Sequence, residues 1–199
     1  MAYPVNLTVG QDEGQNRLWG IPFLGIFVRW ILLIPQLILL FFLGLAIYLY
    51  SLVSWIPVLI GGRQAGAGYA LAEAYFTVSG RVAMYISLAS GRYPGFGWSG
   101  EHPVKATFDR SEGQNRLWGI PFLGIFVRWI LLIPHFIVIW LLGIGLGLLF
   151  LVSWIPVLIN GRQAPAIVNF VGGFYRWALR IFAYALLFTG SYPPFRLGE

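Results

Sequence analysis

Two arginines within apolar stretches are the first residues whose chemistry needs an explanation. Arg29 and Arg128 lie in two identical stretches, EGQNRLWGIPFLGIFVRWILLIP, at 13–35 and 112–134. A guanidinium there could attract an anion along a buried pathway of a channel or transporter. It could also extend its charged end to lipid phosphates while its alkyl stem stays in apolar surroundings. The apolar stretch before each proline is short, which favours the contact with headgroups.

Tryptophans accompany these arginines and recur further along the chain. Trp30 and Trp129 directly follow the arginines, and Trp55 and Trp154 lie near the far end of the next apolar segment. Tryptophan is enriched where hydrocarbon meets headgroups, because its ring is apolar and its N–H is polar. We therefore expect these four side chains at the membrane interface.

A further polar stripe lies on the third apolar segment of each half. At helical spacing Glu73 and Arg81 share one face in the first half, and Arg176 and Arg180 fall on the same face in the second. Glu73 could neutralise Arg81 two turns away, and the arginines could line a polar path.

Histidines offer little for catalysis or metal binding. His102 lies in a polar linker, which predicts a solvated side chain, whereas His135 occupies the position of Gln36 in the other half and suggests hydrogen bonding near headgroups. The chain has no cysteine, and no carboxylates are spaced for metal or acid–base chemistry. We expect no cofactor, no metal and no enzymatic activity.

Composition indicates an integral membrane protein. The chain is 58% hydrophobic and 10% charged, with a mean hydropathy of +0.76, whereas soluble domains are about 45–50% apolar and about 25% charged. The net charge of +6 suits contact with anionic lipid headgroups. The thirteen Lys and Arg are scattered between apolar runs, which argues against nucleic acid as a partner.

The whole chain is a tandem repeat with a constant offset of 99 residues. LVSWIPVLI at 52–60 recurs at 151–159, and GRYPGF near residue 91 corresponds to GSYPPF near residue 190. The chain therefore divides into two membrane units, residues 1–100 and 101–199.

Each unit is predicted to be a short strand followed by helices, in an all-α membrane fold. PVNLTV and its counterpart PVKATF alternate apolar and polar residues, as a strand does. Prolines predict a short interfacial or re-entrant helix over 22–34 and a crossing helix over about 35–60. Segments 69–89 and 168–188 either cross the bilayer or lie in its interface.

Symmetry then suggests the topology. Identical sequences carry the same charge bias, so both units should have the same orientation, which requires an even number of crossings per unit. Two crossings per unit, arranged as parallel repeats, satisfy this. Eight arginines and lysines fall on the side of the termini and two on the opposite loops, which predicts cytoplasmic termini in a multi-pass protein.

Gly143 and Gly147 form a small-xxx-small pair in the second unit. Such a pair permits close packing of membrane helices, so it is a candidate site of self-association.

The sequence resembles an uncharacterised family of bacterial membrane domains of unknown function. RWILLIPHFIVIWLLG at 128–143 and GRQAPAIVNFVGGFYRWALRIFAYALLFTGSYPPF at 161–195 carry the resemblance. The first unit matches more loosely, with GRQAGAGYALAEAY and GRYPGF, and lacks the Arg-Trp pair. The resemblance implies location in a bacterial inner membrane and brings no activity or site residue.

Two functions from different classes remain open. One is a non-enzymatic structural or accessory subunit that packs in a larger membrane assembly, or as a homo-oligomer, or organises lipid. The other is a small oligomeric transporter or channel with an arginine-lined polar path.

Overall fold

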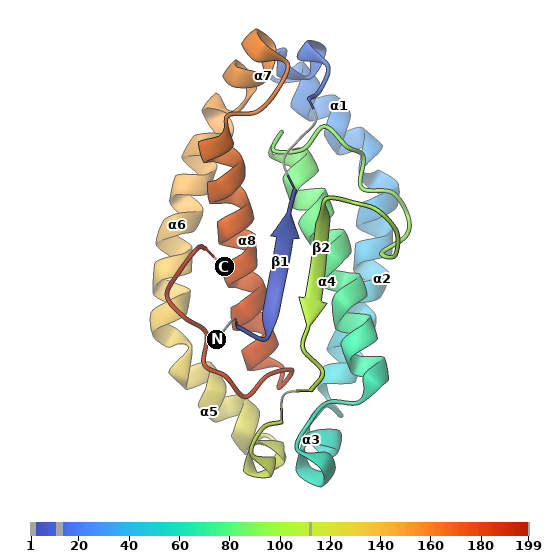
Figure 1. Ribbon diagram of the computed structural model, residues 1–199, viewed down its shortest axis with the longest axis vertical. Coiled ribbons are helices and arrows are strands. Elements are labelled where there is room, and N and C mark those ends of the chain that lie inside the picture. Colours follow the sequence, from blue (N-terminus) through green and yellow to red (C-terminus); the bar gives the residue numbers. More distant parts are fainter. Residues whose placement is uncertain (1–2, 11–13, 112, 199) are drawn as a thin grey trace.

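A pair of strands, one from each unit, lies at the centre of the protein (Figure 1). The computed structural model describes residues 3–10, 14–111 and 113–198. Strands β1 (Val5–Val9) and β2 (Val104–Phe108) form an antiparallel sheet. The predicted short strand in each unit is confirmed.

Helices surround one face of this sheet. Their bounds in the first unit are α1 (Leu24–Leu32), α2 (Ile34–Ser51), α3 (Trp55–Gly61) and α4 (Gly66–Ile86). Those in the second are α5 (Leu123–Leu131), α6 (Ile133–Val152), α7 (Trp154–Asn160) and α8 (Pro165–Ala185). The 3-10 helices η1 (Arg17–Gly20) and η2 (Arg116–Gly119) precede α1 and α5. Figure 1 shows the sheet in front of α4 and α8, with α2 and α6 outside them on the more distant side.

The strand register reveals how the units are related. Leu7 pairs with Ala106, its own equivalent at the offset of 99, and Val5 pairs with Phe108. Antiparallel strands that pair equivalent residues are related by a two-fold rotation whose axis is perpendicular to the sheet. Equivalent helices of the two units therefore run in opposite directions along the long axis, as Figure 1 shows for α2 and α6.

The units exchange their N-terminal segments. Strand β1 packs on α8 of the second unit, and β2 packs on α4 of the first. Helix η1 likewise packs on α7, and η2 on α3. The approach is close, since a Cβ at Gly20 or Gly119 would overlap the backbone of the facing helix. The sequence units 1–100 and 101–199 thus share one interlocked core.

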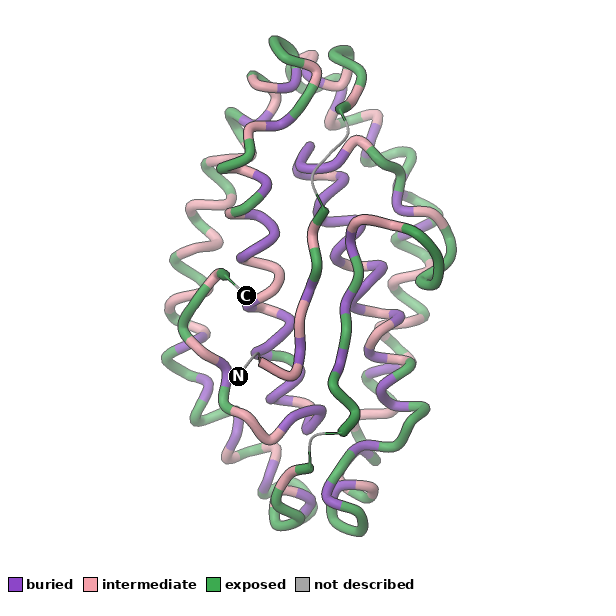
Figure 2. Tube along the Cα trace, in the orientation of Figure 1, coloured by how far each residue is buried: buried purple, intermediate pink, exposed green. Residues whose placement is uncertain are grey.

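The two faces of the sheet differ in polarity because side chains alternate along a strand. Val5, Leu7 and Ala106 are buried against α4 and α8. On the other face, Thr8 and Lys105 are exposed. Figure 2 shows differently buried positions alternating along both strands. One face of the protein is therefore polar at its centre.

The predicted helix over 35–60 is wrong in one respect, because α2 ends at Ser51 and α3 begins at Trp55. Pro57 has no N–H to bond the carbonyl of Val53, so the helical ladder is interrupted there. Helix α2 has 18 residues and is about 27 Å long, somewhat short of a hydrocarbon core of about 30 Å.

Two helical segments in the described part of the chain are long and apolar enough to span a membrane. They are α2 and the segment Ile133–Asn160, which combines α6 and α7. The sequence predicted four crossings, by these two segments and by the two segments that form α4 and α8. Both α4 and α8 instead bury much of their surface against the sheet.

Candidate membrane-contact surface and buried arginines

Arg29 joins α1 to the C-terminal end of α4. Its side chain is 0% exposed, and it donates hydrogen bonds to the carbonyls of Tyr85 and Ser90 and to Oε1 of Gln15. The last carbonyls of a helix lack intrahelical donors and carry partial negative charge, so they suit a guanidinium. Its Cζ also lies 4.3 Å from the ring centroid of Tyr85, at cation–π distance.

Arg128 makes the equivalent contacts in the second unit. It is also 0% exposed, and it donates to the carbonyls of Tyr184 and Thr189, each at 2.7 Å, and to Gln114 at 2.6 Å. The predicted contact of Arg29 and Arg128 with headgroups is therefore wrong. Backbone carbonyls of α4, α8 and the loops after them take the place that lipid phosphates were expected to fill.

The arginines of the predicted polar stripe cover the edges of the sheet. Nε of Arg81 on α4 donates to the carbonyl of Val104 at 3.1 Å, and the equivalent Arg180 on α8 donates to Val5 at 3.4 Å. Arg176 donates to the carbonyl of Leu7 at 3.0 Å. An uncovered strand edge would present unpaired carbonyls. Because these guanidinium groups are bound to backbone, their positions give no support to a polar transport path.

Glu73 does not neutralise Arg81. Its carboxylate accepts a hydrogen bond from Arg110 at 2.7 Å, in an ion pair near the surface. Arg110 follows β2, so this pair joins the two units across α4 and the end of the strand. That interaction was not predicted, because it connects residues 37 apart in sequence.

Glutamines that the sequence analysis did not single out connect the units. Gln64 donates to the carbonyl of Leu187 at 3.1 Å, and its equivalent Gln163 donates to Leu88 at 3.4 Å. Both glutamines are buried. The sequence signal that could have identified these glutamines is the repeated motif GRQA. In both units the structure buries the glutamine of this motif and exposes its arginine.

An extended apolar surface covers the outer helices. Soluble monomers rarely expose contiguous apolar patches above a few hundred Å². Here exposed large apolar residues follow one another along α1, α2 and α3 and again along α5, α6 and α7. Examples on the first unit are Leu24, Phe27, Ile31, Leu37, Ile38, Phe41, Phe42, Leu45, Leu49 and Leu52. Trp30 and Trp129 are exposed on this surface, and Trp55 and Trp154 are partly buried.

Exposed arginines lie at both ends of the long axis. Arg17 on η1 lies beside Gly161, and Arg162 is the next residue in sequence. Arg116 and Arg63 are the corresponding residues at the opposite end. These four side chains are exposed, whereas Arg29 and Arg128 are buried.

Both histidines make hydrogen bonds within the fold. His135 is fully buried, its Nδ1 accepts a hydrogen bond from Trp177 at 3.1 Å, and its ring stacks on Phe195. His102 accepts from the backbone N–H of Val104, and burial together with nearby arginine charge lowers its pKa to about 4. Within the described residues, no three His, Asp or Glu side chains gather as metal ligands.

Gly143 and Gly147 face open space in the described part of the chain. A Cβ built at either position would meet nothing within 4 Å in the described structure. Self-association through them remains a prediction about contacts between chains.

Comparison with protein families assigns the repeated unit. The model of a domain of unknown function, DUF4389, matches residues 24–97 and again 123–196. This chain belongs to that family. The resemblance noted from the sequence is confirmed, and so is the presence of two tandem copies. No curated protein and no solved structure matches the chain.

Each DUF4389 match begins at the start of α1 or α5 and ends after the loop that follows α4 or α8. The exchanged strands and the 3-10 helices lie outside both matches. The family unit therefore comprises the helices and the final loop, and the segment that each unit donates to the other precedes it.

Proposed function

We propose that this protein is a non-enzymatic membrane protein that lies in one leaflet of a bilayer and organises the surrounding lipid, alone or as an accessory subunit of a larger assembly. The outer surface of α1–α3 and α5–α7 contacts acyl chains, and the polar face of the sheet lies toward water. The observation that supports this placement is the two-fold axis perpendicular to the sheet.

The axis distinguishes two ways of placing the helices in a bilayer. If the long helices crossed, the axis would lie in the membrane plane and the identical stretches of the two units would face opposite sides. That conflicts with their identical charge bias. It would also put the exposed Lys105 within the hydrocarbon, at a cost of about 2.5–3.5 kcal/mol on insertion scales.

If the axis instead stands along the membrane normal, both units have the same depth and orientation. This retains the predicted equivalence of the repeats but replaces four crossings with helices lying parallel to the membrane surface. The exposed arginines at both ends then reach the same layer of headgroups. With a net charge of +6, anionic lipid of the cytoplasmic leaflet of a bacterial inner membrane is the matching partner.

Single cysteines test this placement directly, because the chain contains none of its own. Thr8→Cys and Thr107→Cys lie on the polar face, and Arg63→Cys and Arg162→Cys lie at opposite ends. We expect an impermeant thiol reagent to label all four from the cytoplasmic side of inverted vesicles. Labelling of Arg63→Cys and Arg162→Cys from opposite sides would show inverted crossings. Labelling of both from the side opposite Thr8→Cys would show the four-crossing arrangement.

Matched charge substitutions test the lipid contact. Phe41→Glu places a carboxylate on the exposed surface of α2, and Thr8→Glu places the same group on the polar face. We expect Phe41→Glu to weaken flotation with vesicles containing phosphatidylglycerol, and to abolish the ordering of spin-labelled lipid by the protein. Thr8→Glu should preserve both. Anion flux through vesicles that is lost in Arg180→Ala would support the transporter alternative and overturn the proposal.

A further inference from the structure

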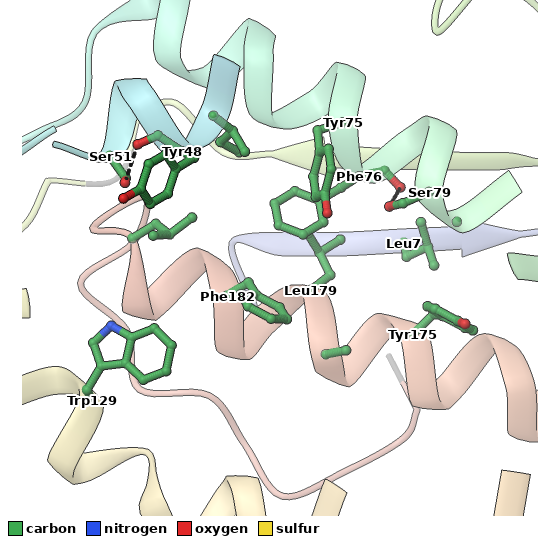
Figure 3. A pocket seen from close by; sticks show the side chains of 14 residues that line it. Leu7, Tyr48, Ser51, Tyr75, Phe76, Ser79, Trp129, Tyr175, Leu179 and Phe182 are labelled. Carbon is green, nitrogen blue, oxygen red and sulfur yellow. Dashed lines mark hydrogen bonds between the residues drawn. The ribbon is translucent and has the colours of Figure 1, made fainter. Parts of the chain in front are cut away.

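An apolar cavity of about 330 Å³ lies between the two units. Its walls come from α2 and α4 of the first unit and from α5 and α8 of the second, and it extends to Leu7 on β1 (Figure 3). Pockets that hold small ligands are typically about 300–1,000 Å³. The cavity is therefore large enough for part of a small apolar molecule.

The cavity opens on the apolar surface and closes at the sheet. Tyr48, Trp129 and Phe182 line it and are 62%, 43% and 44% exposed, so they mark the open side. Leu7 and Leu179 line it and are 1% and 2% exposed, so they form the closed end. A hydrocarbon chain that entered the cavity from the apolar surface would extend to the two-fold axis.

The lining offers no charged side chain to a ligand. None of the described residues around the cavity is charged. The hydroxyls of Ser51 and Ser79 donate to the carbonyls of Tyr48 and Phe76 on their own helices, as Figure 3 shows. Apart from the polar atoms of its tyrosines and of Trp129, the lining presents hydrocarbon and aromatic rings to the interior, and a charged headgroup is favoured only outside the mouth.

The cavity extends further into one side of the protein than into the other, because its lining includes equivalent residues of both units near the two-fold axis. On the other side, a cavity of about 100 Å³ includes five of the equivalent positions, among them Leu146 and Phe150. Phe150 lines that smaller cavity where Ser51 lines the larger one. The two residues are equivalent in the repeat, and the larger side chain lines the smaller cavity.

We propose that the larger cavity binds one hydrocarbon chain of a membrane lipid, with the lipid headgroup remaining at the surface near the mouth. This inference rests on the proposed placement of the apolar surface in the bilayer. The occupant follows from continuity: the open side is surrounded by the surface that contacts acyl chains, so a chain enters without crossing water. One bound hydrocarbon chain per molecule is expected, because the larger cavity includes the two-fold axis and so has no symmetry-related copy of its own size among the described residues.

The test uses phosphatidylglycerol with a photoactivatable diazirine at the end of one acyl chain. The full-length protein is reconstituted in vesicles of this lipid and irradiated. The residues that carry lipid adducts are then identified by peptide mass spectrometry. We expect adducts on Phe76 and Leu179 inside the cavity as well as on the exposed Phe41. In Ser51→Phe and in Ser79→Leu the cavity is partly filled. Cavity adducts should then fall about tenfold, the loss expected when about two methylenes are no longer buried.

Gly143→Leu is the matched control, because it adds a similar side chain on α6 where nothing lies within 4 Å. It should leave cavity adducts unchanged, and adducts on Phe41 should persist in every variant. Adducts on Phe41 without any in the cavity would overturn this inference while leaving the proposed function intact. Cavity adducts that survive both filling variants would also overturn it. Absence of adducts at Phe41 as well would instead refute the membrane placement.

Discussion

Arg29→Met tests the conclusion that the repeated arginine secures the fold and does not contact lipid. Methionine keeps an unbranched apolar stem that reaches about as far as the Nε of arginine, and it removes the guanidinium. The substitution leaves the carbonyls of Tyr85 and Ser90 and Oε1 of Gln15 without this donor. Leaving a buried polar group unpaired costs about 1–3 kcal/mol. We therefore expect the free energy of unfolding to fall by about 3 kcal/mol or more.

The repeat supplies an internal comparison for this measurement. Arg128 makes the corresponding hydrogen bonds, so Arg128→Met should cost a similar amount in the same assay. Arg17→Met removes an exposed guanidinium and should change the free energy by no more than about 0.5 kcal/mol. Equilibrium unfolding in mixed micelles, followed by tryptophan fluorescence and circular dichroism, gives all three values.

The charge of the lipid distinguishes an Arg29 that binds backbone carbonyls from an Arg29 that binds lipid phosphates. If Arg29 binds carbonyls, Arg29→Met lowers the free energy of unfolding by the same amount in neutral and in anionic micelles. If Arg29 binds phosphates, the loss is larger in anionic micelles. A cost below about 1 kcal/mol for Arg29→Met, or a cost that grows with anionic lipid as headgroup contact requires, would refute the structural role.

Three further perturbations have defined outcomes in the same unfolding assay. Glu73→Gln should cost less than about 1 kcal/mol, because its ion pair with Arg110 is near the surface; a larger loss would contradict this. His102 has a pKa lowered from 6.5 to about 4, so the folded state should lose stability as the pH falls from 6.5 towards 4. His102→Gln should flatten that pH dependence, and an unchanged slope would exclude His102 as its source. Gly20→Ala should destabilise by about 1–3 kcal/mol because its Cβ would overlap α7, whereas the open Gly143→Ala should not.

The local structure of each unit was largely predictable from sequence. Alternation in PVNLTV predicted β1, and Pro35 predicted the junction between α1 and α2. The break after Ser51 was missed, because the apolar character continues unchanged through Trp55. Pro57 is the residue that accounts for the break, because it lacks the N–H that would continue the helical hydrogen bonds.

Long-range pairings were not predictable from one sequence. The same apolar sequence surrounds an arginine that contacts headgroups and one that binds helix carbonyls, so sequence periodicity could not predict which partner Arg29 has. The antiparallel pairing of β1 with β2 joins residues about 100 positions apart, and no local pattern records it. The two-fold relation of the units followed only from that pairing.

The exchange of strands has a consequence for how such a chain could have originated. A single ancestral unit would leave its strand unpaired. The face of its last helix, the equivalent of α4 and α8, would also lack the strand that packs on it. A second copy of the same polypeptide supplies both, which describes a strand-swapped homodimer with two-fold symmetry. Fusion of two such copies frees each half to diverge. Ser51 and Phe150 illustrate such divergence, because a symmetric homodimer cannot carry a small residue in one subunit and a large residue at the same position in the other.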